Sequence, residues 1–264
     1  MLTAVCALII ICAIILFVQK TNYGVPSSDT KQTLFDEVYL INLKRRVDRL
    51  QEFTDHYQKS DMRNMSFVRF DAIDGSKLDV DNVPLTELAR AELRQLESSG
   101  YRNKHYQLTK GAIGCYLSHT KVWENIMKSN HDVVLVMEDD AKIPENFLAM
   151  LHESMPHIPS DWDIVLLGYI CNSCVKKNRY KEVKRFMLTH CYLIKREAIH
   201  KIIGTRTLFP ISQQIDAYLS ELSSVLNIYT VKTRMVPQFK SRTDIQAPLE
   251  NKHDKTVNER MRVL

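Results

Sequence analysis

Three consecutive carboxylates, Glu138, Asp139 and Asp140, follow the apolar run at residues 132–137. Like charges this close repel and raise one another's pKa, so such a triplet beside a buried segment needs a positive partner. Mg²⁺ and Mn²⁺ prefer oxygen ligands, and Mg²⁺ often combines carboxylates with substrate phosphates. The pattern therefore indicates a divalent-metal site. The alternative is an acidic turn that precedes the helix expected from Pro144.

The segments that would position these carboxylates alternate between strand and helix patterns. Short apolar runs predict strands at 37–43, 67–70, 132–137, 163–167, 191–194 and 227–231. Apolar residues at helical spacing predict helices at 47–57, 85–97, 111–127 and 211–226. This alternation predicts an α/β fold with a mostly parallel sheet, in which ligands bind beyond the carboxyl ends of strands.

The first residues form a separate feature, because 2–18 contain no charge and no helix breaker. At about 1.5 Å per residue, a helix of that length nearly spans a hydrocarbon core of about 30 Å. We expect a signal-anchor transmembrane helix at 1–20, a polar stem at 21–35, a globular domain at 36–250 and a polar tail at 251–264. A cleaved signal peptide is the alternative. The sequon at Asn64 fits a lumenal domain.

Composition narrows the possible partners. The chain has 264 residues, of which 45% are hydrophobic and 25% charged, with a formal net charge of +5, as in ordinary globular proteins. It has no Lys/Arg block of the type that binds nucleic acid, so we expect no nucleic-acid partner. The densest basic stretch, 176–185, is interpreted as a solvated surface loop or as a weak patch for phosphate or anionic lipid.

Four of the six cysteines lie in the expected domain: Cys115, Cys171, Cys174 and Cys191. An even number in a secretory domain permits two disulfides, in three possible pairings. Cys171 and Cys174 could instead form a redox pair or half of a zinc site, for which His190-Cys191 could supply further ligands.

Five ordered blocks carry a family resemblance: VYLINLKRRVDR at 38–49, FDAIDG at 70–75, LTKGAIGCYLSHTKVW at 108–123, VLVMEDDAKI at 134–143 and WDIVLLG at 162–168. Together they resemble glycosyltransferase family 25, which contains lipooligosaccharide and procollagen galactosyltransferases. IDAYL at 215–219 and SRTDI at 241–245 extend the resemblance more weakly. Ala112 departs from the family pattern, which often has Glu at that place.

The resemblance implies a GT-A-like fold, with a Rossmann-type sheet and flanking helices, that transfers a hexose such as galactose from a UDP-sugar with inversion. The departing UDP gains negative charge, which Mn²⁺ or Mg²⁺ between its phosphates would neutralise. Glu138, Asp139 and Asp140 are then the expected metal ligands, with Asp140 the first choice and a catalytic residue. Asp216 matches a family Asp and is the expected general base, although a carboxylate at a helix N-terminus is the alternative.

Further residues are expected near the UDP-sugar. Asn42 with Arg45 or Arg46 follows the first strand, where polar and basic side chains suit nucleotide and phosphate; surface charges at the start of a helix are the alternative. The same resemblance places three more residues there, with a tight turn and ordinary packing as alternatives: Asp74, Ser118 and His119.

The acceptor expected from the family is a hydroxyl on a glycan, a lipid-linked sugar or a protein hydroxylysine. We expect a single-pass membrane protein whose domain lies in the lumen of the Golgi apparatus or endoplasmic reticulum; a bacterial inner-membrane protein with a cytoplasmic domain is the alternative. Two other interpretations stay open. One is a catalytically degenerate binding or scaffold protein, which Ala112 motivates. The other is a metal-dependent phosphohydrolase, although two-metal sites usually need more ligands than one triplet.

Overall fold

The computed structural model describes residues 33–104, 106–239 and 243–246. The anchor predicted at 1–20, almost all of the stem at 21–35 and the tail at 251–264 lie outside these residues. Within the described part of the chain, no helix combines the length and apolarity needed to cross a bilayer.

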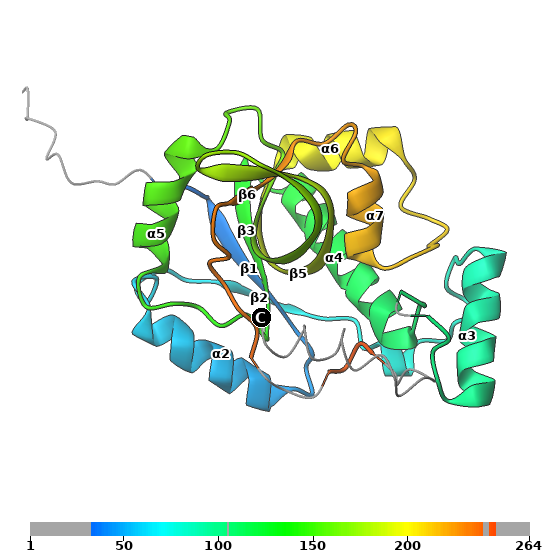
Figure 1. Cartoon of the computed structure of the whole chain (residues 1–264). Helices are drawn as coiled ribbons and strands as arrows, with labels where there is room; N and C mark the ends of the chain where they lie inside the picture. The colour runs from blue at the N-terminus through cyan, green and yellow to red at the C-terminus, as the bar shows by residue number, and fades with distance from the viewer. Residues whose placement is uncertain (1–32, 105, 240–242, 247–264) are drawn as a thin grey trace, which may run out of the picture. The chain divides into compact units, whose positions relative to one another are not determined.

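A six-stranded sheet lies at the centre of the described part, in the order β2-β1-β3-β5-β4-β6 (Figure 1). Its strands are β1 (Glu37–Asn42), β2 (Val68–Asp71), β3 (Val133–Glu138), β4 (Ile164–Lys176), β5 (Tyr180–Lys195) and β6 (Ile228–Val231). The pairs β1–β2, β1–β3 and β4–β6 are parallel, and among these strands only β5 runs against its neighbours. The predicted mostly parallel α/β sheet is confirmed.

Helices cover both faces of this sheet (Figure 1). One face carries α2 (Val47–Lys59) and α5 (Phe147–Ser154), and the other carries α4 (Lys110–Lys128), α6 (Arg196–Thr205) and α7 (Ile215–Glu221). α3 (Glu87–Ser99) belongs to the second side, and two short 3-10 turns complete the set, Gly75–Lys77 and Met155–His157. The predicted helix at 211–226 is wrong in extent, because α7 is confined to Ile215–Glu221.

Alternate residues of the central strands build two separate cores. Leu40 and Leu135 pack with Phe53 on the side of α2, whereas Val136 packs with Trp123 on the side of α4. Successive strand side chains point to opposite faces, so a continuous apolar run fills both cores at once. This burial holds the carboxyl ends of β1 and β3 side by side.

The hairpin of β4 and β5 extends far beyond the strands predicted at 163–167 and 191–194. The basic stretch at 176–185 is largely exposed, as interpreted, but it forms the tip of a paired hairpin and is not a loop throughout. Register shifts between Leu166 and Cys174 bend β4, and the curled hairpin lets β6 pair with β4 and with the start of β5. In the outer segments of this hairpin, polar residues interrupt the apolar ones, so these segments lack the apolar run that identifies a buried strand.

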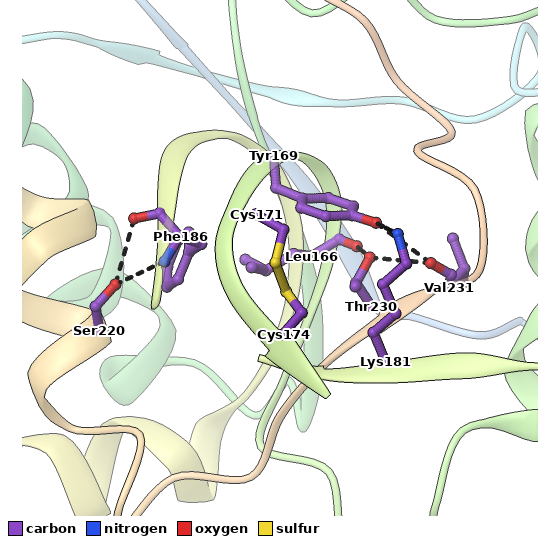
Figure 2. The surroundings of a disulfide bond; sticks show 9 residues. All are labelled: Leu166, Tyr169, Cys171, Cys174, Lys181, Phe186, Ser220, Thr230 and Val231. Carbon is purple, nitrogen blue, oxygen red and sulfur yellow. Dashed lines mark hydrogen bonds between the residues drawn. A yellow bond between two sulfur atoms is a disulfide. The ribbon is translucent and has the colours of Figure 1, made fainter. Parts of the chain in front are cut away.

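A disulfide joins Cys171 and Cys174 within the bent part of β4, with their Cα atoms 6.1 Å apart (Figure 2). The neighbouring Tyr169 hydroxyl donates to the Val231 carbonyl at 3.4 Å, which joins β4 to β6. Cys115 and Cys191 are free thiols. The disulfide fits either a structural pairing or an oxidised redox pair, and it leaves neither sulfur available to ligate zinc.

Candidate active site

Two cavities meet beside the acidic triplet, at the carboxyl end of β3. The first, about 360 Å³, lies between the loops after β1 and β2 and the start of α4. The second, about 320 Å³, lies between the triplet, β5 and α7. Four residues line both cavities: Arg49, Cys115, Glu138 and Ile245. A ligand that filled both would therefore pass directly over Glu138.

Two side chains, Thr189 and His119, contact one carboxylate oxygen of Glu138. The Thr189 hydroxyl donates to Glu138 Oε1 at 2.9 Å, and His119 Nε2 lies 3.2 Å from the same oxygen. Burial opposes ionisation of Glu138, but the contacts with His119 and Thr189 outweigh it and lower the carboxyl pKa. Glu138 therefore carries its charge at the junction of the two cavities.

Asp139 points into the protein, where both of its oxygens accept hydrogen bonds. Asn42 Nδ2 donates to Oδ2 at 2.7 Å, and Arg49 Nη1 donates to Oδ1 at 2.9 Å. Burial raises the pKa of Asp139, while Arg49 and Asn42 favour its charged form. Its carboxylate braces the acidic triplet against β1 and α2.

Asp140 faces the second cavity with one oxygen bound and one free. Gln238 Nε2 donates to Oδ2 at 3.0 Å, whereas the buried Oδ1 has no hydrogen-bond partner among the described residues. Burial and the charge of Glu138 raise the pKa of Asp140 to about 7. An orphaned carboxylate oxygen next to a second carboxylate fits a hard divalent cation, which takes oxygen ligands.

Asp216 lines the second cavity from the first turn of α7. Leu188 N–H donates to its Oδ2 at 3.0 Å and Ala217 N–H to its Oδ1 at 2.8 Å. Leu188 has a φ of +74°, a conformation that is uncommon for a side chain of this size and is often found at functional sites. Burial raises the pKa of Asp216, which makes its carboxylate a stronger base.

The arginines after β1 are held by a segment from the far end of the chain. Arg45 Nη2 lies 2.8 Å from Asp244 Oδ1, Arg45 Nε donates to Asp74 at 2.9 Å, and Arg46 also pairs with Asp244. Arg45 lines the first cavity. Asn42 is buried: its Nδ2 donates to Asp139 and to the Arg46 carbonyl, and its Oδ1 accepts from Arg69.

Asp74 and Ser118 shape the floor of the first cavity. Asp74 accepts from Ser76 N–H at 3.1 Å at the start of a 3-10 turn, and the bonds from Ser76 and Arg45 lower its pKa. Ser118 accepts from Ile73 N–H at 2.9 Å and donates to the Gly114 carbonyl at 2.6 Å. Ser118 therefore ties the loop after β2 to α4.

The two glycines of the G-x-x-G sequence let loops pack directly on α4. A Cβ on Gly111 would lie 2.2 Å from the Asp244 carbonyl oxygen, and one on Gly114 would lie 2.5 Å from the Ile73 carbonyl oxygen. Neither distance is sterically possible. The spacing therefore encodes the close approach of residues 243–246 and of the β2 loop, which together wall the first cavity.

Sequence reasoning did not single out four of the residues that build this site: Arg49, Thr189, Gln238 and Asp244. Arg49 lies in the family-like block at 38–49 and Asp244 in the one at 241–245. Their opposite charges were the sequence signal that could have indicated a role in the site. Gln238 is placed by a bridge between Ala141 and its own backbone, which no local pattern encodes.

A family model described as glycosyltransferase family 25 (LPS biosynthesis protein) matches residues 35–219. The chain is 33% identical over 149 residues to procollagen galactosyltransferase 1-B of Xenopus laevis, covering 54% of this chain and 23% of that protein. It is 31% identical over 141 residues to human procollagen galactosyltransferase 2, covering 51% and 21%. It is 30% identical over 151 residues to human inactive glycosyltransferase 25 family member 3, covering 54% and 23%.

The matched part of this chain thus spans less than a quarter of the length of these relatives. Among solved structures, the inositol-1-phosphate CTP transferase of T. maritima aligns over 86% of this chain and 96% of its own, but its TM-score of 0.34 and 12% identity support no argument. The family model, by contrast, matches most of the chain, and on this ground the chain belongs to glycosyltransferase family 25.

Proposed function

We propose that this protein transfers a hexose from a UDP-sugar to an acceptor hydroxyl, with a divalent cation at Glu138 and Asp140. The observation that carries the proposal is the meeting of two cavities at Glu138, with carboxylates on both sides of the junction. The first cavity, lined by Arg45 and the loops after β1 and β2, would take the nucleotide diphosphate of a GT-A-like donor site. The second would take the acceptor.

The residues present suit Mn²⁺ or Mg²⁺. Glu138 lines both cavities and Asp140 has a free buried oxygen, so these two would hold the ion while Asp139 orients them. When bound, the cation supplies positive charge to the diphosphate that leaves. Arg45 and Arg49 add fixed positive charge at the wall of the first cavity.

Asp216 then acts as general base. The acceptor oxygen attacks the anomeric carbon, the bond from that carbon to UDP breaks with its electron pair leaving on UDP, and the acceptor proton passes to an Asp216 oxygen. The N–H groups of Leu188 and Ala217 hold the carboxylate in one orientation, and each oxygen keeps a lone pair for the proton. A single displacement of this kind inverts the anomeric carbon.

Galactose is the sugar in the printed names of the procollagen galactosyltransferases, and we propose it as the first donor to test. The experiment is a panel of UDP-sugars with candidate glycan, lipid-linked sugar and hydroxylysine acceptors, in Mn²⁺ or in EDTA, read by mass spectrometry. Turnover that needs the metal and is lost in Asp140→Ala is the expected result. Normal turnover by Asp140→Ala overturns the metal assignment, and phosphate release from simple esters would indicate hydrolysis instead.

A second candidate is a catalytically degenerate protein that binds nucleotide or glycan. Relatives named inactive are as similar to this chain as those named galactosyltransferases, and Ala112 lines the second cavity in place of the usual Glu. Calorimetry separates the two: metal-independent nucleotide binding without turnover of any donor favours the binding protein.

We further propose that the protein is a single-pass membrane protein with a lumenal domain in the Golgi apparatus or endoplasmic reticulum. Asn64 of the sequon is exposed, which a glycosylated asparagine requires. Expression in a secretory cell should give a glycosidase-sensitive band that disappears in Asn64→Gln. An unglycosylated protein in the cytosolic fraction would contradict this location.

A further inference from the structure

A chain of four buried polar groups ends at Glu138. Trp123 Nε1 lies 3.0 Å from Tyr192 Oη, Tyr192 Oη lies 2.9 Å from His119 Nδ1, and His119 Nε2 lies 3.2 Å from Glu138 Oε1. The Trp123, Tyr192 and His119 side chains are essentially inaccessible to solvent. Each group in the chain must therefore find its hydrogen-bond partner within the protein.

The direction of this chain follows from what each group can donate. An indole nitrogen only donates, so Tyr192 Oη accepts from Trp123. Among the described residues Tyr192 Oη has one other partner, His119 Nδ1, so the phenolic proton goes there. Nδ1 is then the acceptor nitrogen of the imidazole, the ring proton lies on Nε2, and Nε2–H donates to Glu138.

A metal-ligand role for His119 competes with this assignment. Ligand atoms of Cys115, His119 and Glu138 all lie within 4.8 Å of one another, close enough to share an ion. Ligation through Nε2 would require its lone pair and would place the proton on Nδ1, where it needs an acceptor. Tyr192 Oη already accepts from Trp123, and its own proton would then lose its partner. The hydrogen-bond directions therefore favour His119 as a hydrogen-bond donor to Glu138 over His119 as a metal ligand.

We propose that His119 is a positioning residue that fixes one oxygen of Glu138 by an Nε2–H hydrogen bond, with Trp123 and Tyr192 setting the tautomer. Thr189 donates to the same Oε1 at 2.9 Å, so both bonds use that oxygen and leave Oε2 to ligands in the cavities. The role of Glu138 in holding a cation rests on the proposed function. His119 of the S-H pair then acts on the carboxylate, whereas Ser118 lines the first cavity.

Such support matters because a ligating carboxylate must be held within about 0.5 Å of its productive position. Loss of a residue that hydrogen-bonds to a metal-ligating side chain typically lowers metal affinity or activity about 10–100-fold. Glutamine at position 119 keeps an N–H donor but cannot relay the phenolic proton in the same way. Alanine removes the donor altogether.

The test uses the full chain in detergent, labelled with ¹⁵N-histidine, with the His119 signals assigned by their loss in His119→Gln. We expect the nitrogen shifts of an imidazole that carries its proton on Nε2, and a change of tautomer population in Tyr192→Phe. Signals of an Nδ1–H ring would overturn the proposal. This readout needs no turnover, so it stands even if no UDP-sugar is used.

Metal affinity gives the second readout. His119→Ala should weaken Mn²⁺ binding about 10–100-fold, His119→Gln should restore most of it, and His200→Gln, an exposed histidine of α6, should match the wild type. Melting temperatures report folding: a folded His119→Ala protein with wild-type Mn²⁺ affinity overturns the proposal. Normal Mn²⁺ effects without turnover would instead contradict the proposed function alone.

Discussion

Arg49 Nη1 donates to Asp139 Oδ1 at 2.9 Å, and both side chains are almost fully buried. This pair neutralises the middle carboxylate of the acidic triplet and leaves its neighbours to face the cavities. Removing one partner of a buried ion pair typically costs about 3–5 kcal/mol, because the other charge stays buried. We therefore expect Arg49→Met to lower the free energy of unfolding by that order, as measured by urea denaturation.

The matched control is Arg63→Met, an exposed arginine outside the site. The double variant Arg49→Met/Asp139→Asn should regain part of the lost stability, because no uncompensated charge remains. Additive losses in the double variant would show that the two side chains do not interact.

Asp140 should destabilise the metal-free protein at high pH. Its pKa of about 7 in the fold exceeds the ordinary value of 3.8, so the folded state binds the proton more tightly. The stability contributed by the neutral carboxyl is complete below about pH 4 and is lost as the pH rises through about 7. Asp140→Asn should therefore melt at a higher temperature than the wild type at pH 8 in EDTA.

At pH 4 the melting temperatures of Asp140→Asn and wild type should converge, and Asp55→Asn, an exposed change on α2, should track the wild type throughout. Mn²⁺ should raise the melting temperature of the wild type more than that of Asp140→Asn. An Asp140→Asn protein that is less stable than the wild type at pH 8 would contradict the buried-charge account.

Gly111 should be needed for the wall of the first cavity. A methyl group there would collide with the Asp244 carbonyl, displace residues 243–246 and weaken the contact of Asp244 with Arg45. Gly111→Ala should raise the KM for the UDP-sugar several-fold and cost about 1–3 kcal/mol of stability. Gly204→Ala in α6, where a Cβ has open space, is the control and should be neutral or stabilising. Equal behaviour of the two variants would remove the close-packing argument.

The Cys171–Cys174 disulfide should help to position residues that line the second cavity. Asn172, between the two cysteines, donates to the Tyr106 hydroxyl at 3.2 Å and to Met187 Sδ at 3.4 Å, and both partners line that cavity. Reduction, or Cys171→Ser/Cys174→Ser, should raise the KM for the acceptor but leave UDP affinity unchanged. Asn172→Ala in the oxidised protein should reproduce the effect. A reduced enzyme with an unaltered acceptor KM would separate the disulfide from the site.

The sequence could predict the sheet and the place of the site, because both depend on local patterns. The apolar run before Glu138 encodes a strand buried on both faces, and the acidic triplet marks its carboxyl end. The long hairpin could not be predicted, since polar residues interrupt the outer parts of β4 and β5. Pairing along β4 with β5 and β6 stabilises those parts, and that pairing is a tertiary property.

The different partners of the three carboxylates in the triplet could not be predicted from the sequence either. Successive side chains on a strand point to opposite faces, which separates Asp139 from its neighbours, but only the fold shows that Arg49 and Asn42 donate to it. The same holds for Thr189, which reaches Glu138 from a strand 51 positions along the chain. Partners of this kind are set by strand order, which the sequence pattern left open.

The most direct test of the account compares UDP binding with sugar transfer in two variants, Asp140→Ala and Asp216→Asn. Calorimetry with UDP and Mn²⁺ should show wild-type affinity for Asp216→Asn, whose transfer rate should fall about 10²–10⁴-fold, as for loss of a general base. Asp140→Ala should lose Mn²⁺-dependent UDP binding altogether. Wild-type transfer by Asp216→Asn, or unchanged Mn²⁺-dependent UDP binding by Asp140→Ala, would contradict the proposal that donor and acceptor meet over Glu138.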